Sequence, residues 1–224
     1  MIERTHKSAI RNPDSPLPTP EIFCEKRKAG FATLELMTRI LGISGSLRSG
    51  SYNTALLKAA VPLLEAGVEL EIALLHGIPL YDGDLETAEG LPEGARELKA
   101  RVMACDGLLL ATPEYNNGIP GVFKNAIDWL SRPVSDIQQV FGARPVAVIG
   151  ASPGGFGTVL AQNAWLPVLR TLGMRPWFGR RLMVSRAAQV FNNDGELADE
   201  TVREQLREFL RGFVQFIQAG PAPR

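Results

Sequence analysis

The sequence predicts a doubly wound α/β fold, in which a five-stranded parallel sheet is covered by helices on both sides to give three layers. Three apolar runs are too short for helices and are bounded by small residues, as is typical of buried parallel strands. They lie at residues 40–43, 107–111 and 143–150. Each run leads through a loop rich in glycine and polar residues into a helical segment, and this alternation favours a doubly wound sheet.

The other expected elements follow in chain order. A helix is expected from Asn53 to about Ala66, with Pro62 inside it as a kink or an early break. A strand of alternating apolar and acidic residues, 68–74, belongs near the sheet edge. Residues 76–90 form a long loop. Helices are expected at 92–104, 122–130, from residue 158 to about 172 with a kink at Pro167, and at 199–218, with a strand or strand pair within 174–185.

Length and composition limit the function classes. The chain has 224 residues, 24 basic and 24 acidic, so it has no overall attraction to nucleic acid or anionic lipid. No apolar run approaches the roughly 20 residues of a membrane span. Two cysteines, Cys24 and Cys105, form neither a disulfide framework nor a metal cluster, which favours a cytoplasmic location. His6 and His76 lack ligand spacing and are expected in loops or at the surface, so no metal is predicted.

Residues 1–36 differ from the rest of the chain. The segment 12–21 carries four prolines in polar surroundings without hydrophobic periodicity. We therefore expect a disordered N-terminal extension at 1–36, followed by one folded domain at 37–220.

The loop after the first strand has the residue types of a phosphate site. Hydroxyl, amide and guanidinium groups can all donate to phosphate oxygens, and the unpaired N–H groups of the following helix attract anions. These candidate donors are Ser44, Ser46, Arg48, Ser51, Asn53 and Thr54. An ordinary turn in which Ser51 or Asn53 only caps the helix is the alternative. The loop contains neither GxxxxGK[ST] nor GxGxxG, which favours a mononucleotide phosphate.

The loop at 113–121 is suited to a flat heterocycle with hydrogen-bonding edges. It contains Pro113, Glu114, Tyr115 and Asn116. The proline stiffens the backbone, Tyr115 offers an aromatic edge, and Glu114 and Asn116 offer polar contacts beside it. A turn stabilised by Asn and Pro without any ligand is the alternative. For Glu114, orienting the loop is favoured over acting as a general base.

The loop at 151–157 allows two functional interpretations. Residues 150–154 match GxSxG between a strand and a helix, the context of a serine-hydrolase nucleophile. That class needs a histidine after Ser152, and neither histidine follows it. The sequence therefore favours a backbone that passes close to a planar ring at Ser152, Gly154 and Gly155. Because all three loops follow parallel strands, we expect them to converge on one ligand at the carboxyl edge of the sheet.

Two of these segments together resemble a known family. ISGSLRSGSYNT at 43–54, and TPEYN at 112–116 followed by GIPG at 118–121 and KNAIDWLSR at 124–132, resemble the NAD(P)H-dependent FMN reductases. These form a flavodoxin-like group that includes quinone and chromate reductases. The likeness runs from about Arg39 to the C-terminus.

The resemblance implies a flavodoxin-like sheet and a non-covalently bound FMN. Its phosphate would lie on the six donors of the first loop, and its isoalloxazine between residues 113–116 and residues 152, 154 and 155. The implied activity is hydride transfer from NADPH or NADH through FMN to a quinone, a free flavin, an azo compound or chromate. Family members are dimers or tetramers, so the resemblance also implies a homo-oligomer. This chain departs from the family at position 160, where it has leucine and many relatives carry arginine.

The alternative function is a flavodoxin-like electron-transfer or regulatory protein that binds FMN without nicotinamide turnover. Electron carriers of this kind are usually acidic, to meet basic partners. The balanced charge of this chain favours the enzyme.

Overall fold

A computed structural model describes residues 37–220. The extension expected at 1–36 lies outside the described residues. No helix within 37–220 combines the length and the apolar character that crossing a membrane requires.

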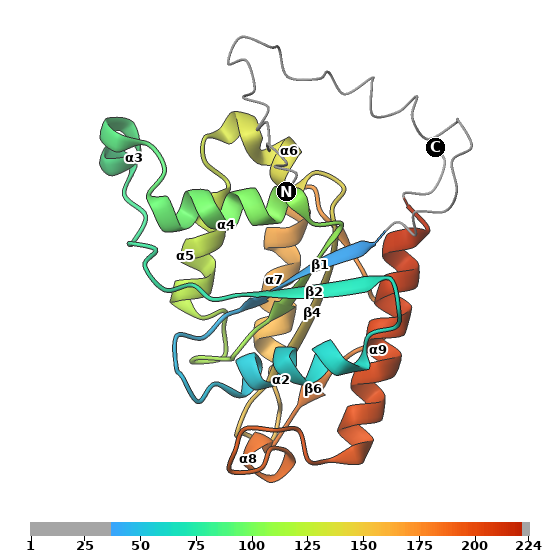
Figure 1. The fold of residues 1–224 in the computed structure, drawn as a ribbon. Helices are drawn as coiled ribbons and strands as arrows, with labels where there is room; N and C mark the ends of the chain where they lie inside the picture. Colours follow the sequence, from blue (N-terminus) through green and yellow to red (C-terminus); the bar gives the residue numbers. More distant parts are fainter. Residues whose placement is uncertain (1–36, 221–224) are drawn as a thin grey trace, which may run out of the picture. The chain divides into compact units, whose positions relative to one another are not determined.

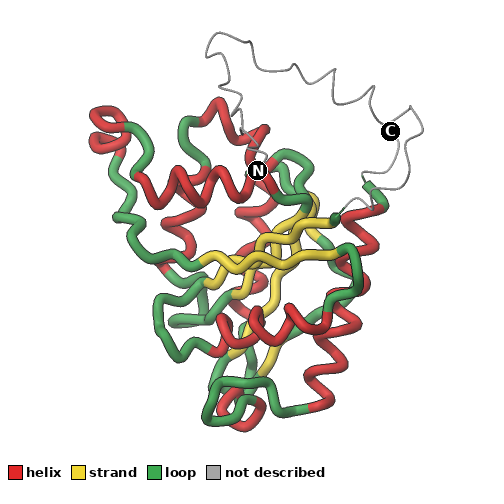
Figure 2. The backbone as a smooth tube through the Cα atoms, in the orientation of Figure 1, coloured by secondary structure: helices red, strands yellow, loops and turns green. Residues whose placement is uncertain are grey.

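The described chain forms the predicted doubly wound sheet. Its strands are β1 (Thr38–Ser44), β2 (Val68–Ala73), β3 (Gly107–Ala111), β4 (Pro145–Ala151), β5 (Arg175–Pro176) and β6 (Met183–Val184). The order is β2-β1-β3-β4-β5, β6 also pairs with β4, and these pairings are parallel (Figures 1 and 2). The flavodoxin-like order, the edge position of β2 and the strand pair within 174–185 are therefore confirmed.

Alternating side chains of the central strands face two separate cores. Ile40 of β1 and Leu109 of β3 lie in the core that α2 (Tyr52–Ala60) and α9 (Glu200–Gln218) cover. Leu41 and Leu108 lie in the other core. That core is covered by α4 (Glu93–Ala104), α5 (Gly121–Leu130), α6 (Ile137–Phe141) and α7 (Val159–Thr171). Burial on both faces explains why the central strands are continuous apolar runs.

Most helix boundaries agree with the sequence. The helix expected to run to about Ala66 ends earlier, at Ala60, and a 3₁₀ turn, η1 (Val61–Leu63), follows. Of the two effects expected of Pro62, the structure has the early break and not the kink. Pro167 lies inside α7. The tryptophans Trp129 and Trp165 are fully buried packing residues.

The expectation of a structureless loop at 76–90 is wrong. It contains α3 (Gly83–Glu89), whose N-cap Asp82 accepts a hydrogen bond from the N–H of Asp84 at 2.9 Å. Figure 1 shows α3 beyond α4, away from the sheet. None of its residues is buried, so no apolar periodicity marks it in the sequence.

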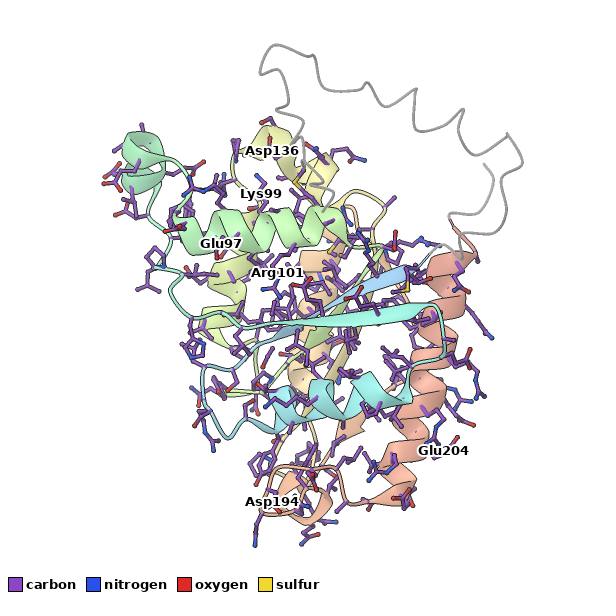
Figure 3. The ribbon with its side chains drawn as sticks, in the orientation of Figure 1. Glu97, Lys99, Arg101, Asp136, Asp194 and Glu204 are labelled. Atoms are coloured by element: carbon purple, nitrogen blue, oxygen red, sulfur yellow. The ribbon has the colours of Figure 1, made fainter. Side chains whose placement is uncertain are left out.

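Some short helices were not predicted from the sequence: η2 (Val134–Asp136), α6 and α8 (Ala187–Val190). A buried lysine fixes the first of these to α4. Lys99 Nζ donates to Asp136 Oδ2 at 2.6 Å and to the carbonyl oxygen of Arg132 at 2.5 Å. Figure 3 labels Lys99 on α4 and Asp136 beside it.

Candidate functional site

Three loops leave the carboxyl ends of β1, β3 and β4, and side-chain contacts join each to another. The first and second loops meet where Gly45 packs against Phe123 and Pro113, so closely that an added Cβ would lie 2.9 Å from Pro113 Cδ. Asn53 of the first loop bonds to Ala151, where the third loop begins. Glu114 of the second loop bonds to α7, the helix that follows the third loop. The structure thus brings together the candidate residues of all three loops.

Ser51 is the N-cap of α2. Its hydroxyl oxygen accepts hydrogen bonds from the N–H groups of Asn53 (3.2 Å) and Thr54 (3.3 Å). Because that oxygen only accepts, the hydroxyl hydrogen of Ser51 stays available to a ligand. The capping alternative and a ligand role are therefore compatible at this residue.

The Asn53 side chain is engaged elsewhere. Its Nδ2 donates to the carbonyl oxygen of Ala151 and its Oδ1 accepts from the N–H of Ala151, both at 2.9 Å. Both residues are buried. Asn53 thus joins the start of α2 to the end of β4, and its second amide hydrogen is what remains for a ligand.

The remaining donors of the first loop are only partly used within the protein. Ser44 Oγ and Thr54 Oγ1 share one hydrogen bond at 2.7 Å, which leaves one of their two hydroxyl hydrogens unused. Ser46 Oγ accepts from the N–H of Arg48 at 3.3 Å and keeps its own hydrogen. Among residues 37–220, the N–H groups of Ser46, Leu47, Ser49 and Gly50 donate to no protein acceptor.

Arg48 is exposed and forms no ion pair with any described acidic residue. A Cβ at Gly50 would meet nothing within 4 Å, so the space beside this turn is open. Hydroxyl hydrogens, unpaired backbone N–H groups and a guanidinium around open space fit a phosphate monoester.

The sequence did not identify His76 as a neighbour of this loop. Its Nε2 lies 3.0 Å from the carbonyl oxygen of Leu47, which fixes the loop against the segment after β2. Nothing in the local sequence signals this contact, because 29 residues separate the two positions.

The second loop contains a tight turn. Tyr115 and Gly118 exchange backbone hydrogen bonds at 3.2 and 3.1 Å, and Asn116 and Asn117 between them have φ of 50° and 61°. Two successive left-handed residues define a type I′ turn, for which asparagine is well suited. The turn accounts for both asparagines and leaves Tyr115 and Asn116 exposed, while Pro113 is buried.

Glu114 accepts hydrogen bonds at the start of α7. Its Oε2 receives the N–H of Leu160 at 2.9 Å and that of Ala161 at 3.0 Å. The side chain therefore orients the loop, which is the role that the sequence favoured. Only the backbone of Glu114 is then left to contact a ring.

The third loop presents its backbone to solvent. Ser152 Oγ accepts from the N–H of Gly154 at 3.1 Å, so the hydroxyl stabilises the turn. A Cβ at Gly155 would meet nothing within 4 Å, and Pro153 to Phe156 are exposed. His76 bonds to Leu47 and not to Ser152, so the described residues provide no histidine base for a hydrolase nucleophile.

Lys124 and Asp128 form a half-exposed ion pair at 2.5 Å on α5. At one sheet edge the candidate residues together offer hydrogen-bond donors beside a guanidinium, and two loops with exposed residues. This arrangement fits a flat, singly phosphorylated group such as FMN.

Comparison with known proteins agrees with this site. The family model of NADPH-dependent FMN reductases matches residues 38–189. An NAD(P)H-dependent FMN reductase of Pseudomonas aeruginosa is 42% identical over 180 residues, which cover 80% of this chain and 95% of that protein. A 2-hydroxy-1,4-benzoquinone reductase of Burkholderia sp. is 33% identical over 80% of this chain and 96% of its own length.

Among solved structures, the flavoenzyme NAD(P)H:(acceptor) oxidoreductase FerB of Paracoccus denitrificans is similar, with a TM-score of 0.71 and 36% identity. The match covers 82% of this chain and 98% of that one.

Proposed function

This chain belongs to the NADPH-dependent FMN reductase family, and from that premise we propose which residues hold the flavin and which class of acceptor it reduces. The protein is an FMN-dependent oxidoreductase that uses NAD(P)H. Bound FMN would supply the redox chemistry, namely hydride transfer from the reduced nicotinamide and electron transfer to an acceptor.

The first loop would hold the phosphate. Arg48 supplies the positive charge, and the hydroxyls of Ser46 and Ser51 and the Ser44–Thr54 pair supply donors, with Asn53 keeping the helix start in place. The single observation that carries this assignment is the set of loop N–H groups and hydroxyl hydrogens without protein acceptors around open space.

The second and third loops would bind the ring. The backbone of residues 113–116 faces one part of it, and Ser152, Gly154 and Gly155 border the other. No side chain is required as nucleophile or acid, because the protein contributes binding, orientation and exclusion of water.

We propose a quinone as the acceptor. The supporting observation is that a relative named as a 2-hydroxy-1,4-benzoquinone reductase matches most of the chain. Free flavin, azo compounds and chromate are the other candidates to be assayed.

The experiment is reconstitution with FMN followed by stopped-flow reduction with NADPH and NADH, then turnover with a panel of acceptors. We expect flavin bleaching by a nicotinamide and faster NAD(P)H oxidation with quinones. Protein that binds FMN tightly but is not reduced by either nicotinamide would support the electron-carrier alternative.

We also propose a homodimer or homotetramer in the cytoplasm. Leu80 lies between Pro79 and Tyr81, whose backbone groups bond to Asn125 and Trp129 of α5. Its side chain is 80% exposed, and an apolar side chain so exposed is a suitable contact for a second copy. Analytical ultracentrifugation of the wild type and of Leu80→Ser tests this, and a monomeric wild type would contradict it.

A further inference from the structure

The N-terminus of α7 has no cap of its own. Thr158 is the N-cap residue, yet its side chain makes no capping hydrogen bond. Instead Thr158 Oγ1 accepts from Gln162 Nε2 at 3.1 Å and packs against Gly150 of β4. The first N–H groups of this 13-residue helix therefore need an acceptor from elsewhere.

Glu114 supplies that acceptor from 46 residues away in the sequence. Its carboxylate oxygen Oε2 receives the N–H groups of Leu160 and Ala161, the second and third residues of α7. A negative charge at this position is also stabilised by the helix dipole.

The same contact joins the second loop to the helix that follows the third loop. Glu114 lies between Pro113 and the type I′ turn of the second loop, whereas α7 begins where the third loop ends. At its other end the third loop is fixed by the bonds between Asn53 and Ala151. The third loop is also held through its backbone, because the N–H groups of Arg186 and Ala187 donate to the carbonyl oxygens of Gly154 and Ser152. Pro153 to Phe156 are nevertheless exposed.

We propose that Glu114 is a positioning residue that sets the separation of the second and third loops, and thereby the width of the slot for the flavin ring. Its carboxylate acts on α7 and neither transfers a proton nor contacts the flavin. This inference rests on the proposed flavin site.

Three variants separate position from charge. Glu114→Gln keeps an acceptor oxygen of the same reach without the charge, so it preserves the contact to α7. Glu114→Ala removes the contact. Glu114→Asp keeps the charge but is one methylene shorter, and it serves as the second disruptive variant if the alanine protein does not fold.

The matched control is Asp199→Ala. Asp199 caps α9 in the same way, with its Oδ1 accepting the N–H of Val202 at 3.0 Å, and belongs to none of the three loops. Its loss should lower stability as the loss of a helix cap usually does, without changing the separation of the second and third loops.

Two readouts are needed. Amide hydrogen exchange of the FMN-free protein measures protection of Leu160 and Ala161, and quenching of FMN fluorescence measures Kd. We expect Glu114→Ala to speed exchange at both amides and to raise Kd by about tenfold or more, the scale of a lost charged hydrogen bond. Glu114→Gln should remain within about threefold of the wild-type Kd, and Asp199→Ala should lower only the melting temperature.

The proposal is overturned if Glu114→Ala speeds exchange but leaves Kd unchanged, because Glu114 is then only a helix cap. It is also overturned if Glu114→Gln binds FMN as weakly as Glu114→Ala, because charge would then matter and not position. A wild type that does not bind FMN would instead refute the proposed function, and the exchange data would show separately whether Glu114 holds α7.

Discussion

The side-chain amide of Asn53 forms two hydrogen bonds with the backbone of Ala151, both 2.9 Å long, across 98 residues of sequence. Both residues are buried, so the amide substitutes for a backbone strand partner at the end of β4. The same amide fixes the first loop to the start of the third loop, so a packing contact and the proposed phosphate site depend on one residue.

Asn53→Ala should lower the free energy of unfolding of the FMN-free protein by about 2–4 kcal/mol, because it removes two hydrogen bonds and leaves the buried N–H and C=O of Ala151 unpaired. Urea denaturation measures the loss. Asn193→Ala is the control, since Asn193 is exposed in the loop after α8. Equal stability of the two variants would show that the Asn53 contacts contribute nothing.

Arg48→Ala should weaken FMN binding by about 1.5–3 kcal/mol, the value of a charged hydrogen bond, with little change in stability because Arg48 is exposed. Fluorescence titration gives the affinity. Arg96→Ala, on the exposed face of α4, controls for the loss of one positive charge. An affinity equal to that of the wild type would remove Arg48 from the phosphate site.

Much of this fold could be predicted because burial leaves a pattern in the sequence. The strands β1, β3 and β4 are buried on both faces and read as apolar runs, whereas α3 buries nothing and could not be found. The sequence also indicated which loops meet, since parallel strands end at one edge. It could not indicate that Asn53 binds the backbone of Ala151, because the partner is a main-chain group whose position only the fold determines.

Within one loop, two glycines should respond differently to alanine. A Cβ at Gly45 would overlap the ring of buried Phe123 and lie 2.9 Å from Pro113 Cδ, whereas one at Gly50 would meet nothing within 4 Å. Gly45→Ala should destabilise the FMN-free protein by about 1–3 kcal/mol, the usual effect of overpacking, and Gly50→Ala should change stability little. Thermal unfolding of both proteins distinguishes them. A Gly45→Ala protein as stable as Gly50→Ala would show that the first and second loops do not pack as described.

The contact between Lys99 and Asp136 should make stability depend on acid pH. The hydrogen bond from Lys99, helped by that from Ser135, holds the pKa of Asp136 below its ordinary value. A carboxyl whose folded-state pKa is lowered stabilises the fold above its unfolded pKa, about 3.9, and this contribution disappears as the pH falls through the folded value.

Asp136→Asn should therefore be less stable than the wild type near pH 7, and the difference should shrink below about pH 4. Urea denaturation of both proteins between pH 7 and the lowest pH at which they remain folded measures it. Asp194→Asn, at an exposed turn, is the control for removing one carboxylate charge. If the difference in unfolding free energy between Asp136→Asn and the wild type were the same at both ends of the pH range, the stabilisation would not come from the ionised carboxylate. The contact of Lys99 with the Arg132 carbonyl would then be the one that holds α4 to this segment.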